Sequence, residues 1–264
     1  MPNASFSVPG ESAVITGAGS GIGREITNHL TSLGVDVAIN DVDEAALVEA
    51  ESEMASNQGD LRTITDDASD MSAATDLVDL AVSEFGGVDI LINNVGIAGP
   101  TKPCEEMAME EFIGTIEVNL GAMFATSKAA IPHLRKSGSG RIVNLSSMSG
   151  KRPLMNRTPY ATSKMGVIGF TRTLATEVAT DGITVNAICP GSVKGDRLDA
   201  VIEGQAKSQS RSVSEVEAEF KDVSPMKRFV QASDVADTVV YLCSERAASM
   251  TGQDLNVTAG IVMY

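Results

Sequence analysis

The chain has no tryptophan and, among its 264 residues, only three tyrosines, two histidines and three cysteines. The cysteines, Cys104, Cys189 and Cys243, are odd in number and far apart, which argues against a disulfide framework or a CxxC metal site and is typical of a reducing compartment. His29 and His133 have no partner at metal-ligand spacing. We therefore expect free thiols and no metal site.

Positive charge is also scarce. Twenty Lys and Arg residues stand against 35 Asp and Glu residues, which gives a formal net charge of -15. A surface of this sign repels nucleic acids and anionic membranes, so neither partner is expected. No apolar run reaches the ~18 residues of a membrane span, and Met1–Glu11 lacks the basic start and apolar core of a signal peptide. These absences predict a soluble, cytoplasmic protein.

Short β-rich apolar runs alternate with longer helical segments, and no linker or repeat divides the chain. The expected strands are Ala13–Thr16, Val35–Asn40, Leu61–Thr65, Val88–Asn93, Arg141–Leu145, Ile183–Ile188 and Asp254–Val257. The expected helices are Ile22–Leu33, Glu44–Ser56, a segment through Leu77 and Val82, Glu110–Leu134, Tyr160–Ala179 and Ser233–Cys243, the last with Ser233 as its cap. Such alternation predicts a doubly wound α/β fold, three layers around a parallel sheet, in a single domain of residues 1–264.

The segment Lys194–Met226 fits no strand and is polar. Connections of this length in a compact α/β domain are often functional lids. We expect a helical lid or a mobile loop over about residues 194–226.

The glycine-rich run Thr16–Gly23 (TGAGSGIG) lies between the first expected strand and the first expected helix. Its glycines permit a tight turn, and the N-terminus of the helix that follows presents free N–H groups to an anion. A glycine-rich run is weak on its own, but this strand–turn–helix context predicts a dinucleotide pyrophosphate site.

Asp41 ends the second expected strand. A carboxylate there can accept hydrogen bonds from the adenosine ribose and would repel a 2′-phosphate, and Ser20 brings no positive charge to the turn. The sequence therefore favours NAD over NADP. The alternative is that Asp41 merely caps the next helix.

Tyr160 and Lys164 stand four residues apart at the start of an expected helix, which places the phenol and the ammonium on one face. A nearby cation favours the phenolate and lowers the tyrosine pKa from its usual value of about 10, as proton exchange near neutrality requires. The YxxxK spacing is common by chance, so its neighbours in the chain decide its meaning.

Together with TGxxxGxG at 16–23, the segment Asn93–Gly96 (NNVG) and the strand end Asn144–Ser147, this pair resembles the short-chain dehydrogenase/reductase family. The resemblance extends from about residue 8 to residue 260 and involves several motifs in the same order. It implies a Rossmann fold, a homotetramer or homodimer, and an NAD-dependent oxidoreductase that interconverts a secondary alcohol and a ketone.

The resemblance also implies a role for individual residues. Ser147 would hydrogen-bond the reacting oxygen, with Ser146 as the neighbouring alternative, and Tyr160 would be the general acid/base. Lys164 would bind the nicotinamide ribose, and Asn119 would support a proton-relay water. The implied cofactor-binding residues are Gly17, Ser20, Gly21, Ile22, Gly23, Asp41, Asp67, Ala68, Asn93, Gly96, Tyr160, Lys164, Pro190, Gly191 and Val193.

The chain departs from the family pattern at two positions. Val95 replaces the usual alanine and adds bulk near the cofactor. Gly195 stands where a threonine is frequent, which removes one side-chain hydrogen bond to the nicotinamide carboxamide and leaves that contact to the backbone of Val193.

Basic residues gather around the expected substrate pocket of this acidic chain: Lys151, Arg152, Arg157, Lys194 and Arg197. Arginine suits carboxylate, phosphate or sulfonate, so one hypothesis is a small hydroxylated substrate with an anionic group. The alternative is that these are surface or subunit-contact charges. A 3-oxoacyl thioester reductase, a sugar, polyol or cyclic diol dehydrogenase, and a non-enzymatic NAD-binding sensor or scaffold also remain open.

Overall fold

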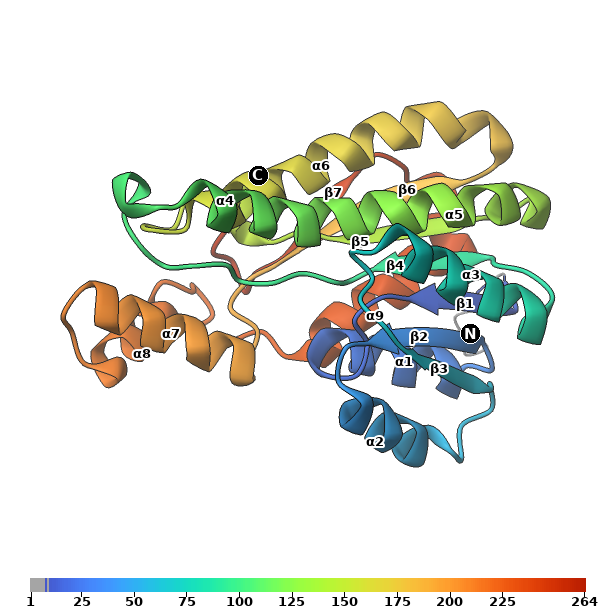
Figure 1. The fold of residues 1–264 in the computed structure, drawn as a ribbon, viewed down its shortest axis with the longest axis horizontal. Coiled ribbons are helices and arrows are strands. Elements are labelled where there is room, and N and C mark those ends of the chain that lie inside the picture. The colour runs from blue at the N-terminus through green and yellow to red at the C-terminus, as the bar shows by residue number, and fades with distance from the viewer. Residues whose placement is uncertain (1–7, 9) are drawn as a thin grey trace.

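The computed structural model describes residue 8 and residues 10–264. Seven strands form one parallel sheet in the order β3-β2-β1-β4-β5-β6-β7 (Figure 1). The strands are β1 (Ser12–Ile15), β2 (Asp36–Asp41), β3 (Leu61–Thr65), β4 (Ile90–Asn93), β5 (Arg141–Leu145), β6 (Thr184–Pro190) and β7 (Asp254–Val257). The strand order reverses between β1 and β4, the kind of point where open α/β sheets bind ligands. The predicted doubly wound fold is confirmed.

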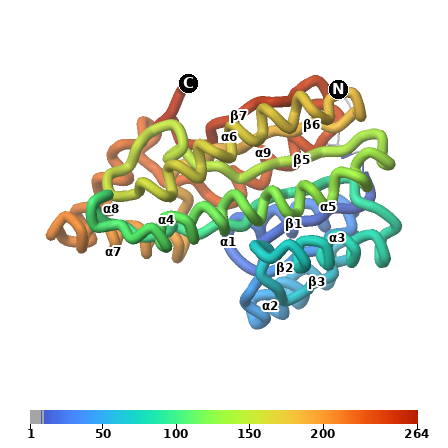
Figure 2. Tube along the Cα trace, turned by 45° about the horizontal axis from the view of Figure 1, so that its top comes forward, coloured from blue at the N-terminus to red at the C-terminus, as the bar shows by residue number. Residues whose placement is uncertain are grey.

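Helices cover both faces of the sheet and complete the three layers (Figures 1 and 2). One face carries α1 (Gly21–Ser32), α2 (Glu44–Met54) and α9 (Ala232–Cys243). The other carries α3 (Met71–Phe85), α5 (Ala122–Ser137) and α6 (Thr158–Val178). Each layer buries its own apolar core against the sheet, so the carboxyl ends of the strands are held rigidly.

The prediction of one continuous helix over Glu110–Leu134 is wrong. The segment is divided into α4 (Met109–Ile116), a π-helical turn at Glu117–Gly121 and α5. The turn buries Asn119, whose amide pairs with the backbone of Ile97 through both its oxygen (2.7 Å) and its nitrogen (3.1 Å). Such π-bulges are frequent at functional sites, and this one directs a polar side chain inward.

Several other expected boundaries shift by one to three residues. The first helix ends at Ser32, and Leu33 is exposed beyond it. The expected cap Ser233 is also wrong, because α9 begins at Ala232 with Gln231 as its N-cap. The N–H of Gln231 donates to the Asp234 carboxylate (2.9 Å), which satisfies the helix end two residues earlier than the sequence pattern suggests.

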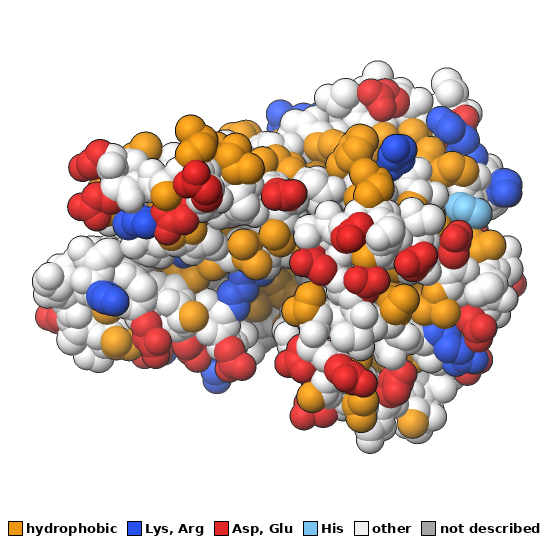
Figure 3. Space-filling view, in the orientation of Figure 1, with side chains coloured by type: hydrophobic (Ala, Val, Ile, Leu, Met, Phe, Trp, Pro, Cys, Tyr) orange, Lys and Arg blue, Asp and Glu red, His pale blue; other side chains and the backbone are white. Residues whose placement is uncertain are grey.

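The segment expected to be a lid contains α7 (Asp196–Ser208) and α8 (Val213–Asp222), which project beside the carboxyl ends of the strands (Figure 1). The two helices pack together through Leu198, Ile202, Val216 and Phe220. Figure 3 shows a hollow between this projection and the rest of the molecule, with basic side chains at its edge. Its closure over a ligand stays a prediction.

No helix within the described part of the chain is long and apolar enough to cross a membrane. The stretch Met1–Glu11, for which we expect no signal peptide, lies mostly outside the described residues. Cys104, Cys189 and Cys243 are free thiols, as expected.

Candidate active site

A cleft of about 720 Å³ opens at the carboxyl ends of the strands, between the sheet and α7. It brings together fourteen residues for which the resemblance implies a role and which are far apart in the sequence. Those that line it are Gly17, Ser20, Gly21, Ile22, Asp41, Asp67, Ala68, Gly96, Ser147, Tyr160, Lys164, Pro190, Gly191 and Val193, of which Ser147 was expected for catalysis alone. Gly23, Asn93 and Asn119 do not line it.

The glycine turn has the shape of an anion cradle. Gly17 and Gly21 adopt φ values of +61° and +56°, which L side chains rarely adopt. A side chain on Gly21 would meet no protein atom within 4 Å, so the space beside it is open to a ligand. A Cβ on Gly23 would lie 2.7 Å from the Gly17 carbonyl oxygen, which makes Gly23 the residue that lets α1 pack closely on the turn.

Asp41 lines the end of this cleft that is formed by the glycine turn and the carboxyl ends of β2 and β3. Its carboxylate accepts a hydrogen bond from the Gly19 N–H (2.9 Å) and therefore fixes the turn. The alternative that Asp41 caps the next helix is wrong, because the N-cap of α2 is Asp43. Among the described lining residues, this end carries Asp41, Asp66 and Asp67 and no cation. Arg24, the nearest basic residue along α1, is bound to Glu49 and Glu53 on α2.

Asn93, which is expected to pack along the cofactor, does not line the cleft. Its side chain is buried and bonds Ser127, Asn144 and Thr126 behind the cleft. The next residue, Asn94, lines the cleft instead, and its amide donates to the carbonyls of Thr16 (3.1 Å) and Gly17 (2.7 Å). Sequence reasoning missed Asn94, although its place inside the NNVG motif could have indicated it.

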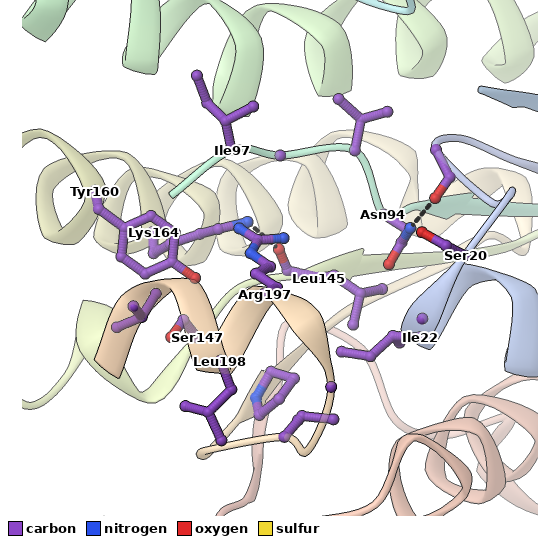
Figure 4. Close-up of a pocket in the computed structure, with 18 of the residues that line it drawn as sticks. Ser20, Ile22, Asn94, Ile97, Leu145, Ser147, Tyr160, Lys164, Arg197 and Leu198 are labelled. Carbon is purple, nitrogen blue, oxygen red and sulfur yellow. Dashed lines mark hydrogen bonds between the residues drawn. The ribbon is translucent and has the colours of Figure 1, made fainter. Parts of the chain in front are cut away.

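Ser147, Tyr160 and Lys164 converge on the same hollow (Figure 4). The Ser147 hydroxyl accepts a hydrogen bond from the Ser149 N–H (3.1 Å), so its own proton can be donated into the hollow, to Tyr160 or to a ligand. Ser146 donates its hydroxyl proton to the Lys164 carbonyl (2.7 Å), which ties β5 to α6. Of the two serines, Ser147 is therefore the one able to donate to a ligand.

Cations surround the Tyr160 ring. Burial alone would raise the pKa of the phenol, but nearby charges, Arg197 and Lys164 first among them, lower it below its usual value. A hydrogen bond with Ser147 and the charge of Arg157 lower the pKa further. Tyr160 therefore reaches its phenolate form at a lower pH than a free tyrosine.

Lys164 is itself almost fully buried, and its ammonium donates to the Leu145 carbonyl (2.8 Å). Burial lowers the pKa of this lysine to about 8. Gly96 leaves it room, since a Cβ there would lie 3.2 Å from the lysine nitrogen and 3.0 Å from the Asn119 amide oxygen. Asn119 thus backs the wall that Lys164 lines.

The strand end after β6 shapes the far side of the cleft. Gly191 lies so close to Thr258 that a Cβ would approach its Cα to 2.9 Å. Val193 faces Val230 in a short parallel bridge whose hydrogen bonds use Ser192 and Lys194, so the Val193 N–H takes no part in it. Gly195 adopts φ +141°, a conformation that a threonine would enter only with strain.

Of the five basic residues expected around the substrate pocket, three line the cleft and two do not. Lys151 is turned away, bound to Asp254 (2.6 Å) and Asn256 (2.9 Å). Arg152 is exposed and does not line the cleft. Arg157, Lys194 and Arg197 do line it.

Comparisons with known proteins agree with this geometry. The family model described as enoyl-(acyl carrier protein) reductase matches residues 17–262. The D-beta-hydroxybutyrate dehydrogenase of Rhizobium meliloti is 32% identical over an alignment of 267 positions that covers 95% of this chain and 98% of that protein.

Two solved structures have the same fold. NAD+-bound xylitol dehydrogenase has a TM-score of 0.92 and 29% identity, covering 96% of this chain and 100% of that one. A variant of actinorhodin polyketide ketoreductase with NADPH has a TM-score of 0.91 and 36% identity, covering 98% and 99%. The chain belongs to the short-chain dehydrogenase/reductase family and is an oxidoreductase of keto and hydroxy groups that binds a nicotinamide cofactor.

Proposed function

We propose that this protein is an NAD-dependent oxidoreductase that interconverts a secondary alcohol and a ketone, with Tyr160 as the general acid/base. The observation that carries the proposal is the meeting of Ser147, Tyr160 and Lys164 in one cleft with the glycine turn. A phenol with a lowered pKa, beside a serine able to donate a hydrogen bond, suits proton transfer to and from an alcohol oxygen.

When bound, a nicotinamide supplies the carbon that accepts or returns the hydride. In alcohol oxidation, the Tyr160 phenolate takes the hydroxyl proton while hydride leaves the adjacent carbon. Ser147 donates a hydrogen bond to the reacting oxygen and stabilises the charge that develops there. The charge of Lys164 lowers the pKa of Tyr160 and so favours the phenolate. Asn119 pairs with the backbone of Ile97 and thereby holds the segment in which Gly96 lies close to the Lys164 ammonium. In ketone reduction, Tyr160 returns the proton.

The preference for NAD rests on the charge at the adenosine end. Asp41, Asp66 and Asp67 would face a 2′-phosphate with carboxylates, and no described lining residue there offers a cation to it. The solved relatives with NAD+ and with NADPH agree with a nicotinamide cofactor of either kind, so this charge pattern is the argument for NAD.

The substrate we propose is a small hydroxylated compound with an anionic group, since cations line the other end of the cleft. The similarity to D-beta-hydroxybutyrate dehydrogenase supports it. The polyketide ketoreductase and xylitol dehydrogenase favour the alternatives, a 3-oxoacyl thioester reductase or a sugar, polyol or cyclic diol dehydrogenase. A non-catalytic NAD-binding sensor or scaffold would have no need for the assembled Ser147, Tyr160 and Lys164.

We also propose a cytoplasmic homotetramer or homodimer. Phe124 on α5 and Met165 on α6 are half exposed on neighbouring helices, and such apolar surface suits contact with a second copy. Ile168 and Leu174, other apolar residues of α6, are buried within the chain and belong to its core.

The proposed activity is tested by the formation of reduced cofactor across a panel of hydroxy acids, polyols and cyclic diols, each with NAD and with NADP. We expect turnover with NAD and at least one class of secondary alcohol. The absence of turnover across the panel in both directions, with cofactor bound, would favour the sensor or scaffold.

Replacing Asp41 with alanine should lower the preference for NAD over NADP by roughly 10- to 100-fold, because a charged group that repels one cofactor and hydrogen-bonds the other is lost. The measurement is kcat/KM with each cofactor. Asp43→Ala is the matched control, since it removes the same charge two residues away, from a side chain that does not line the cleft. An unchanged preference in Asp41→Ala would contradict the assignment.

A further inference from the structure

Two arginines from different parts of the fold meet at Tyr160. The guanidinium carbon of Arg157, at the N-terminus of α6, lies 4.7 Å from the Tyr160 ring centroid, and that of Arg197, in the first turn of α7, lies 5.9 Å away. Figure 4 shows Arg197 reaching from α7 toward the tyrosine. The two charges are close enough for Arg197 to depress the pKa of Arg157, in addition to the larger effect of burial.

Neither arginine has an acidic partner among the described residues. Arg157 is only 2% exposed, yet its Nε has no hydrogen-bond partner, and its one hydrogen bond goes to the Ala98 carbonyl (2.8 Å). A buried arginine is normally paired, because removing a charge from water is costly. The arrangement therefore leaves the buried charge of Arg157 without an acidic partner in the cleft, beside the exposed guanidinium of Arg197.

The rest of this end has the same sign. Lys164 and Lys194 also line it, and Asp196 is the one carboxylate among the described residues there. In a chain of net charge -15, three cations gathered around one tyrosine do not reflect the average charge of the surface. The adenosine end of the same cleft is acidic, so the cleft is polarised along its length.

We propose that Arg157 and Arg197 together form a two-part binding site for the acidic group of the substrate, an oxyanion held between the body of the enzyme and α7. This inference rests on the proposed function and adds the residues that select the substrate. Because both guanidinium groups flank the Tyr160 ring, the acid must lie a few bonds from the carbon that is oxidised. A short hydroxy acid, phosphate or sulfonate fits; a neutral polyol leaves both arginines unpaired. Binding of the anion would also join α7 to the start of α6 and draw the projection over the cleft.

The site can be tested without knowing the substrate, through the tyrosinate absorbance of the cofactor-bound protein. The chain has three tyrosines and no tryptophan, so the signal of Tyr160 can be isolated by comparison with Tyr160→Phe. Acetate, methanesulfonate and phosphate are the anionic probes, acetamide is the neutral analogue of acetate, and chloride keeps the ionic strength constant. An anion bound between the arginines should offset their charges and raise the pH at which Tyr160 ionises, whereas acetamide should not.

In Arg157→Met and Arg197→Met, the dissociation constant of the effective anion should rise roughly 10- to 100-fold, the effect of losing a charged hydrogen-bond partner. Arg157→Lys should lose most of the affinity as well, because a lysine lacks the planar donor pair. Arg152→Met is the matched control, an arginine of the same loop that does not line the cleft, and should bind the anion as the wild type does.

Equal responses to acetate and acetamide, or an anion response that survives in both arginine variants, would overturn the proposal. Reduced-cofactor binding by each variant reports that it is folded. Failure of the proposed function has a different signature, which is turnover that persists in Tyr160→Phe. Which of the three anions binds most tightly identifies the acid that the substrate carries.

Discussion

Replacing Tyr160 with phenylalanine is expected to lower turnover by roughly 100- to 10000-fold, the usual contribution of a positioned acid/base. The substitution removes only the phenolic oxygen and leaves the ring in contact range of Arg157 and Arg197. Steady-state kcat with the best substrate of the panel is the measurement. The affinity for the reduced cofactor, followed by its fluorescence, should remain close to that of the wild type.

Tyr264→Phe is the control for this substitution, because it deletes the same atom from an exposed tyrosine outside the cleft. Its turnover should equal that of the wild type. Near-normal turnover in Tyr160→Phe would remove Tyr160 from the chemistry and with it the proposed mechanism.

Replacing Lys164 with methionine is expected to reduce kcat for alcohol oxidation by roughly 100-fold or more near neutral pH, since the general base loses its support. Lys164 is one of the cations that lower the pKa of Tyr160, so its loss raises that pKa. Oxidation requires the phenolate; its rate therefore rises with pH, and the rise should move to higher pH in the variant. The pH dependence of kcat measures this shift.

Lys194→Met is the matched control for Lys164→Met. Lys194 lines the same cleft, but it is exposed and does not contribute to the lowered pKa of Tyr160. Its pH dependence should follow the wild type. A Lys164→Met profile that coincides with the wild type would mean that the lysine does not act through the tyrosine.

The fold was predictable because its signals are local. Alternating apolar strands and amphipathic helices indicate a parallel sheet directly, and the glycine turn lies where strand and helix meet. The π-helical turn at Asn119 was not predictable, because it depends on the pairing of that amide with Ile97, which is distant in the chain.

Some residues of the candidate site could likewise be predicted from local patterns, and others could not. Tyr160 and Lys164 follow from a spacing, and Asp41 from the end of a strand. The basic residues do not: Lys151 and Arg157 look alike in the sequence, yet one is bound to Asp254 and the other is buried against Tyr160. The sequence likewise does not show that Asn94, and not Asn93, lines the cleft. That depends on which of the two side chains points into the core at the end of the strand.

The central claim is that Tyr160, with its pKa lowered by surrounding cations, is the group whose ionisation controls the reaction. It is tested most directly by titrating the tyrosinate absorbance of the cofactor-bound protein and comparing it with the pH dependence of kcat for alcohol oxidation. We predict one tyrosine ionising below the usual pKa of about 10, at the same pH as the rise in kcat, and absent from Tyr160→Phe. A low-pH ionisation that persists in Tyr160→Phe, or a kcat that does not follow it, would contradict the account.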